Sequence, residues 1–255
     1  MTASITERAE RSFTRSFQSY HERASEQARI ADLLAQRLSD LAPSKSFSSA
    51  FEIGCGTGHL THALLRRFSI ASLTVNDLVP NASRLAASLG ARFLKGDIRD
   101  VVWPESPQLI ASASSLQWLD APEALLQKAA TRLIPGGWLA FSSFGPAQFH
   151  ELRCLGFSAQ APGLRWPEAL AKAVQSTGSG LDIADLVQER RQLWFESPLD
   201  VLRHLQQTGV NAAASRVWTR TTLAHFSDRY VQAFGTPRGV PLTYHPTWMI
   251  AHKAL

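Results

Sequence analysis

The chain has 255 residues and a formal net charge of +5, and 45% of its residues are hydrophobic. These values fit a globular enzyme with one core, and no apolar run reaches the roughly 18 residues that a membrane span needs. Basic residues form no dense block interleaved with aromatic residues, so we do not expect a nucleic-acid partner. Two cysteines give no disulfide framework, and the charged N-terminus lacks the apolar segment of a secretory signal. We therefore expect a cytoplasmic protein.

The first 45 residues predict helices. Apolar residues between Phe13 and Leu41 recur at spacings of three and four, which is typical of an amphipathic helix, in one or two pieces. The sequence APSKS then interrupts the pattern. We expect residues 1–45 to form an N-terminal helical segment.

Residues 46–145 alternate between short apolar runs and helical stretches. The expected strands are SAFEI, IASLTV, ARFL, QLIASAS and WLAFSSF. The expected helices run from about Gly58 to Phe68, from Ala82 to Leu89 and from Pro122 to Leu133. Strict alternation of strand and helix predicts an α/β fold in which helices cover both faces of a mostly parallel sheet.

The alternation ends after Phe144. Residues 146–187 indicate helices and loops outside the sheet, and we expect a helical insert there. Residues 188–255 are expected to complete the sheet, with a strand at RRQLWFE, a helix at PLDVLRHLQQTG and a terminal strand. Pro246 cannot donate to a strand ladder, so the last strand is expected to begin at Thr247 or to bulge there. The whole chain, residues 1–255, is predicted to be a single domain.

The stretch FEIGCGTGHL places three glycines on the first turn from strand to helix. A glycine at such a turn lets a ligand approach the backbone closely, and ligands of open α/β sheets bind at the carboxyl ends of strands. A dinucleotide fingerprint that starts at Gly54 requires its last small residue at position 59, which is His59. The third glycine comes one residue early, at Gly58, so the dinucleotide register fails.

The turn resembles the first motif of the class I S-adenosylmethionine-dependent methyltransferases, an acidic residue followed by G-x-G-x-G. EIGCGTG matches this motif, Asp77 ends the second strand in LTVND, and LKGDI ends the third strand with Asp97 and Ile98. The resemblance implies a Rossmann-like fold with an antiparallel last strand, and S-adenosylmethionine as cofactor. It also implies that Asp77 accepts the ribose hydroxyls, whereas the alternative makes both aspartates helix N-caps. The expected cofactor-binding residues are Tyr20, Glu52, Gly54, Cys55, Gly56, Gly58, Asp77, Leu78, Asp97, Ile98 and Ser114.

The cysteines and histidines match no pattern of a cysteine nucleophile or of a metal site. Cys55 is expected to be a small buried residue beneath the cofactor, because no histidine or asparagine pattern of a cysteine enzyme accompanies it. The eight histidines form neither H-E-x-x-H nor a paired Cys/His spacing. We therefore expect no metal.

The chain as a whole resembles the malonyl-acyl carrier protein O-methyltransferases, the carboxyl-methylating enzymes of early biotin synthesis. The resemblance rests on SFQSYHERASEQARIADLL, LQWLDAPEALL, LRHLQQTGVNA and VPLTYHPTWMIAHK. It extends over about the full length and is weakest over residues 146–187. The chain departs from the pattern at Gln108, where many class I enzymes have an acid, and at the serine-rich SASS.

This resemblance implies a reaction and a set of substrate residues. Residues 1–45 would form a helical lid over the cofactor, with residues 46–145 as the cofactor-binding core. The acceptor would be the free carboxylate of malonyl-acyl carrier protein or malonyl-coenzyme A, acting on a monomeric enzyme. That carboxylate is ionised at neutral pH, so no catalytic general base is expected. The expected substrate-binding residues are Gln117, Trp118, Arg203, Tyr244 and His245, with Arg203 first because its planar guanidinium matches a carboxylate.

Three alternatives stay open at this stage. A class I enzyme that methylates another small carboxylate or a carbon acid would keep the cofactor and change the acceptor pocket. A nucleic-acid methyltransferase acting on amino groups would carry a [DN]-P-P-[YFW] signature after the fourth strand, which this chain lacks. A non-catalytic regulator that binds S-adenosylmethionine is the third.

Overall fold

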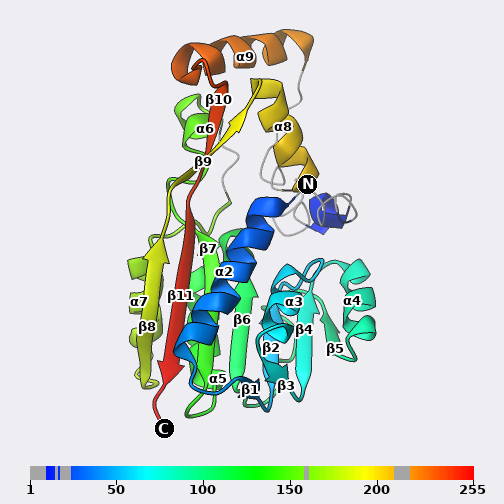
Figure 1. Ribbon diagram of the computed structural model, residues 1–255, viewed down its shortest axis with the longest axis vertical. Coiled ribbons are helices and arrows are strands. Elements are labelled where there is room, and N and C mark those ends of the chain that lie inside the picture. Colours follow the sequence, from blue (N-terminus) through cyan, green and yellow to red (C-terminus); the bar gives the residue numbers. More distant parts are fainter. Residues whose placement is uncertain (1–9, 15–16, 18–23, 158–160, 210–218) are drawn as a thin grey trace.

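A seven-stranded sheet forms the centre of the molecule (Figure 1), seen in a computed structural model that describes residues 10–14, 17, 24–157, 161–209 and 219–255. The strand order is β5-β4-β2-β6-β7-β11-β8. The strands are β2 (Ala50–Ile53), β4 (Leu73–Asp77), β5 (Arg92–Lys95), β6 (Leu109–Ala113), β7 (Trp138–Phe144), β8 (Leu181–Gln188) and β11 (Pro246–Lys253). The five strands from β5 to β7 are parallel, and β11 is antiparallel to both of its neighbours. The predicted fold class is confirmed.

Two hydrophobic clusters cover opposite faces of this sheet. On one face, Leu109 and Ala111 pack with α2 (Ser25–Leu41) and α3 (His59–Leu65). On the other face, Ile110 packs with α5 (Pro122–Arg132) and α7 (Pro167–Gln175). Because successive side chains of a strand point to opposite faces, β6 and β7 supply both clusters, and they are buried even at Ser112, Ser142 and Ser143. Within the described part of the chain, no helix is long and apolar enough to cross a membrane.

A second group of elements lies above the carboxyl ends of the parallel strands (Figure 1). It contains an antiparallel pair, β9 (Arg191–Phe195) with β10 (Val240–Tyr244), and three helices, α6 (His150–Cys154), α8 (Pro198–Gln207) and α9 (Arg220–Phe234). The Tyr230 hydroxyl donates to the Pro241 carbonyl at 2.7 Å and ties α9 to β10. The remaining elements are short: β1 (Ser46–Phe47), β3 (Ser69–Ile70), η1 (Pro80–Ala82), α4 (Ser83–Ser88) and η2 (Leu116–Trp118).

The predicted helical insert at residues 146–187 is wrong in its last part. Helices α6 and α7 lie there, but β8 is an edge strand of the main sheet and, among the described strands, pairs only with β11. An edge strand has one partner and a half-exposed surface, so it tolerates polar residues such as Asp182 and Asp185. Those two acids interrupt the apolar pattern by which a strand is predicted from the sequence.

The assignment of residues 188–255 to the main sheet also needs correction. Of the described strands that begin after residue 188, only β11 joins that sheet, because β9 and β10 form the separate pair. The last strand begins at Pro246 rather than Thr247, and its irregularity lies between Ile250 and Ala251. Proline is tolerated as the first residue of a strand, where a missing N–H costs the ladder little. Pro246 still takes part through its carbonyl, which accepts from the Glu189 N–H at 3.0 Å.

Candidate functional site

A cavity of about 160 Å³ lies at the carboxyl ends of β2, β4 and β6. Ten of the residues expected at a cofactor or substrate line it: Glu52, Gly54, Cys55, Gly56, Asp77, Leu78, Asp97, Ile98, Ser114 and Trp118. Gly58, Gln117, Arg203, Tyr244 and His245 do not line it. Tyr20 falls outside the described residues. The structure thus brings nine of the eleven predicted cofactor residues together and separates four of the five predicted substrate residues from them.

The glycine turn has the backbone that its sequence predicts. Gly54, Gly56 and Gly58 have φ values of +68°, +52° and +91°, which side chains other than glycine rarely adopt. A Cβ at Gly54 would collide with the Ser115 hydroxyl, whereas one at Gly56 would meet no protein atom within 4 Å. Gly56 therefore presents bare backbone to the cavity. Gly58 lies behind this surface, at the N-cap of α3.

Asp77 shapes the turn from the end of β4. One carboxylate oxygen accepts from the Gly56 N–H at 2.7 Å, and the other accepts from the Val79 N–H at 2.8 Å. Burial raises the pKa of Asp77, and these backbone hydrogen bonds act in the opposite direction. Each oxygen retains a second lone pair, so Asp77 can still accept hydrogen bonds from a ligand in the cavity.

Glu52 is the most deeply buried acid of the cavity. Burial raises its pKa to about 8, and the charge of Asp77 adds to the effect. Its Oε2 atom has no hydrogen-bond partner in the described part of the chain. A buried carboxyl group with a vacant acceptor is suited to a cationic ligand group, which would restore its charged form.

Asp97 and Ile98 follow β5 and form another wall of the cavity. Both oxygens of Asp97 bind Arg99, at 2.9 Å from Nε and 2.5 Å from Nη2. The Arg99 guanidinium lowers the pKa of this carboxyl group, which stays charged at neutral pH. Ile98 is buried, and its carbonyl accepts from the Trp103 indole at 3.0 Å. An acid next to an apolar surface suits a base with an amino group and a flat face.

The segment after β6 forms the wall of the cavity opposite the wall that follows β5. Ser114 has a φ of +55°, and its carbonyl accepts from the Gln117 Nε2 at 2.6 Å. Gln117 thus supports this segment from outside the cavity. Trp118 lines the cavity, and its indole N–H is buried without a hydrogen-bond partner among the residues described.

The N-terminal segment contributes aromatic side chains to the same cavity. Glu10, Phe13 and Phe17 line it, and the Phe13 ring meets Trp118 edge to face at a centroid distance of 5.4 Å. The Ser12 hydroxyl donates to the Gly209 carbonyl at 3.0 Å, which joins this segment to the end of α8. These contacts enclose the cavity on the side away from the sheet.

The other predicted substrate residues have different surroundings. Arg203 is exposed on α8 and pairs with Asp200 at 2.6 Å, because the buried positions of this helix are Pro198, Val201 and Leu205. Leu205 faces inward on this helix, and Leu202 is partly buried against the same core.

Tyr244 and His245 are fully buried. The Tyr244 hydroxyl lies 2.8 Å from His204 Nε2, and His245 Nδ1 accepts from the Ala147 N–H at 3.0 Å. Its other ring nitrogen lies 2.8 Å from Gln188 Oε1. Burial lowers the pKa of His245 and favours the neutral ring. Both ring nitrogens of His245 are thus occupied by the protein.

Gln27 is a cavity residue that the sequence did not reveal. It lies on the first turn of α2 and is 4% exposed, and Ala31 lines the cavity one turn later. Its sequence signal was weak, because a glutamine in an amphipathic helix is usually a solvent-facing residue.

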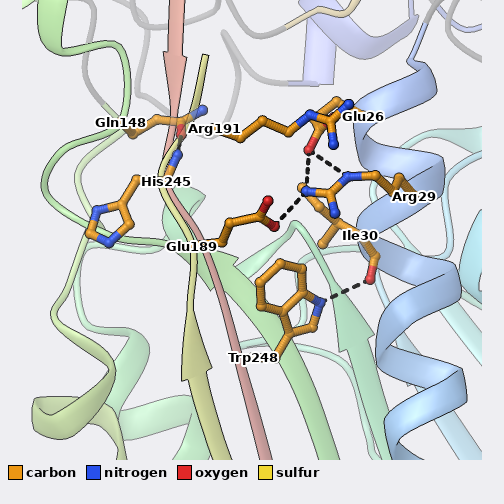
Figure 2. Close-up of polar contacts among 8 residues, drawn as sticks. All are labelled: Glu26, Arg29, Ile30, Gln148, Glu189, Arg191, His245 and Trp248. Atoms are coloured by element: carbon orange, nitrogen blue, oxygen red, sulfur yellow. Dashed lines mark hydrogen bonds and ion pairs between the residues drawn. The ribbon is translucent and has the colours of Figure 1, made fainter. Parts of the chain in front are cut away.

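An ion-pair cluster around the buried Glu26 anchors the same turn of α2 (Figure 2). Arg29 binds Glu26 through Nε at 2.9 Å and Nη2 at 2.7 Å, and it also binds Glu189 at 2.8 Å. Arg191 adds a longer contact to Glu26, at 3.4 Å. The Trp248 indole donates to the Ile30 carbonyl at 3.0 Å. The start of α2 is therefore fixed to β9, β11 and the β8–β9 corner.

Across the described ranges, no group of three or more histidine, cysteine, aspartate or glutamate residues is placed to hold a metal ion. The buried thiol of Cys55 has a raised pKa because of burial, which makes it a poor nucleophile.

Comparison with known proteins gives the family. Residues 51–141 match the model of a methyltransferase domain. A putative methyltransferase from Bacillus halodurans superposes with a TM-score of 0.62 over 87% of this chain and 99% of its own, at 14% identity. A Haemonchus contortus phosphoethanolamine N-methyltransferase, solved with S-adenosylhomocysteine, gives a TM-score of 0.54 at 14% identity over 88% of this chain and 52% of its own. The malonyl-[acyl-carrier protein] O-methyltransferase of Prosthecochloris aestuarii is 36% identical over 94% of this chain and 91% of its own length. The chain belongs to the malonyl-[acyl-carrier protein] O-methyltransferase family.

Proposed function

We propose that the chain transfers a methyl group from S-adenosylmethionine to the free carboxylate of a malonyl thioester, in the early part of biotin synthesis. The observation that carries the proposal is the full-length similarity to relatives named for this reaction. The acyl carrier protein is the expected acyl carrier, as in those names, and malonyl-coenzyme A is the alternative.

The cavity fits S-adenosylmethionine by its vacant hydrogen-bonding groups. Asp77 has acceptor capacity left for two ribose hydroxyls, and Asp97 with Ile98 suits the adenine base. Gly56 leaves room next to the backbone where any Cβ would intrude on a ligand. The vacant Oε2 of Glu52 suits a ligand ammonium group. When bound, S-adenosylmethionine supplies an electrophilic methyl group on a sulfonium.

The protein's share of the chemistry is to orient the acceptor and to exclude water. The acceptor carboxylate is ionised at neutral pH and needs no base to activate it. Phe13, Phe17 and Trp118 enclose the cavity, which keeps competing water from the reacting carboxylate. We propose Trp118 as a substrate-binding residue, because its buried indole N–H has no partner among the described residues and can donate a hydrogen bond to an acyl group.

Methylation of matched thioesters tests the proposed function. With S-adenosylmethionine labelled in its methyl group, we expect label in malonyl-acyl carrier protein and none in acetyl-acyl carrier protein, which lacks the nucleophilic carboxylate. Malonyl-coenzyme A in the same assay compares the two carriers. Label transfer to free small carboxylic acids alone would point instead to another small-molecule methyltransferase. Cofactor binding without turnover on any of these acceptors would favour a regulatory role.

Glu52 makes cofactor binding depend on pH. With a pKa of about 8, its carboxyl group is mostly protonated at pH 6.5 in the free protein. A ligand ammonium beside it stabilises the charged form, so binding lowers this pKa and releases a proton. We expect affinity for S-adenosylmethionine to rise between pH 6 and pH 7.5, by up to about tenfold per pH unit.

Calorimetric titration at pH 6.5 in buffers of different ionisation enthalpy measures the released proton. Glu52→Gln keeps the size of the side chain and cannot ionise, so this variant is expected to release no proton. If Glu52→Gln released as much as the unmodified protein, the proton would come from Asp77, and the role given to Glu52 would be wrong.

A further inference from the structure

Gln27 carries a vacant amide inside the cavity. Its side chain is 4% exposed and lines the cavity, and neither its Oε1 nor its Nε2 atom has a hydrogen-bond partner among the described residues. A buried amide without partners is costly, and most buried polar groups in folded proteins are paired. The vacant amide therefore indicates a ligand group that supplies both a donor and an acceptor.

An unpaired carboxyl oxygen of Glu52 limits which kinds of ligand group fit beside Gln27. Oε2 of Glu52 lines the same cavity, lacks a partner in the described ranges, and can only accept once the group is ionised. Together the two side chains offer one donor group, the amide Nε2, and two acceptors. A carboxylate alone satisfies the donor and leaves both acceptors vacant. A zwitterionic α-amino acid satisfies all three, since its ammonium donates and its carboxylate accepts.

We propose that Gln27 and Glu52 together bind the amino-acid end of S-adenosylmethionine, with Gln27 as the residue that recognises its α-carboxylate. This inference rests on the proposed function. Nε2 of Gln27 donates to the α-carboxylate, while Oε1 of Gln27 and Oε2 of Glu52 accept from the ammonium. Either orientation of the amide plane presents one donor and one acceptor, so the assignment does not depend on it.

The ion-pair cluster of α2 holds Gln27 in place for this role. Glu26 precedes it and is 3% exposed, fixed by Arg29 on the side of α2 that faces the β8–β9 corner (Figure 2). Successive residues of an α-helix point about 100° apart. Fixing Glu26 toward that corner therefore directs the side chain of Gln27 toward a different side, where it lines the cavity.

The inference predicts selectivity between two ligands that share a nucleoside. S-adenosylhomocysteine carries the amino-acid end, and 5′-methylthioadenosine lacks it. For Gln27→Leu, we expect the dissociation constant of S-adenosylhomocysteine to rise about tenfold or more. The dissociation constant of 5′-methylthioadenosine is expected to change less than about twofold, because its ribose and adenine contacts are untouched. Calorimetric titration of the full chain measures both constants.

Three further variants make the test specific. Gln36→Leu changes an exposed glutamine of the same helix and is expected to alter neither constant. Asp97→Ala is expected to weaken both ligands equally. Gln27→Glu keeps the shape but adds a negative charge beside the α-carboxylate, so it is expected to weaken S-adenosylhomocysteine more than Gln27→Leu does.

The outcomes separate this inference from the function on which it rests. Equal weakening of both ligands by Gln27→Leu, or no weakening of S-adenosylhomocysteine, overturns the role of Gln27. Unchanged S-adenosylhomocysteine binding with a raised KM for malonyl thioester would overturn it too, and would assign the amide to the acceptor carboxylate. If the unmodified protein binds neither ligand, the proposed cofactor itself is wrong.

Discussion

Asp77→Ala is expected to weaken S-adenosylmethionine binding by at least about a hundredfold. A charged acceptor for the ribose hydroxyls contributes about 1.5–3 kcal/mol, which alone corresponds to roughly tenfold to more than a hundredfold in affinity. Asp77 also accepts from the N–H groups of Gly56 and Val79, so the variant loses the contacts that shape the turn. Loss of the ribose acceptor and loss of the turn contacts both lower the affinity for S-adenosylmethionine, so their effects add. Calorimetric titration of the folded variant measures the effect.

An exposed acid of a neighbouring segment provides the control. Asp100→Ala removes a carboxylate that does not line the cavity. The affinity of this variant for S-adenosylmethionine is expected to match that of the unmodified protein. Asp77→Asn retains the shape of the side chain and separates loss of charge from loss of the turn. Binding of Asp77→Ala within threefold of the unmodified protein would remove Asp77 from the cofactor site.

Arg29→Met is expected to lower the free energy of unfolding by about 2 kcal/mol, less than the roughly 3–5 kcal/mol for breaking a fully buried ion pair, because only Glu26 of the cluster is buried. The Glu26 side chain is 4% exposed and depends on Arg29 for its two short contacts. After the change, Arg191, at 3.4 Å, is the one cation left beside Glu26 among the described residues, and Glu189 loses its bond to Arg29. Methionine preserves most of the aliphatic volume, so the loss reports the electrostatic contacts. Urea denaturation at pH 7 measures it.

Arg203→Met is the matched control, since it removes an arginine whose ion pair is exposed to water. The Arg203 side chain is 68% exposed, and its pair with Asp200 is screened by solvent. We expect little change in stability and in turnover on malonyl thioester. Equal destabilisation by Arg29→Met and Arg203→Met would mean that the cluster around Glu26 does not hold α2 in place.

The sequence was sufficient for the parts of the site that lie on one local motif. The glycine turn and Asp77 follow directly from strand ends, because the carboxyl ends of parallel strands must meet at one edge of the sheet. Their placement needs no knowledge of distant contacts. The same holds for the buried strands β6 and β7, whose apolar runs are typical of a sheet covered on both faces.

Parts of the site that depend on distant contacts were not predictable in this way. Arg203 was expected to face a pocket, but the helix turns Val201 and Leu205 inward and leaves the arginine in water. Gln27 shows the opposite case, because its side chain reaches the cavity only after α2 is fixed to β9 and β11. A periodic pattern gives the spacing of a helix face and does not give the element that this face will meet.

The position of β11 between β7 and β8 has a consequence for synthesis on the ribosome. A chain is made from its N-terminus, and β7 ends at Phe144 while β11 begins only at Pro246. While residues 145–245 are being synthesised, β11 does not yet exist. The outer edge of β7, and β8 once it is made, therefore lack the strand with which both pair. Unpaired strand edges are sites of misassociation between chains. Slower translation of this stretch lengthens the time for which that edge is unpaired, so we expect it to lower the yield of folded enzyme.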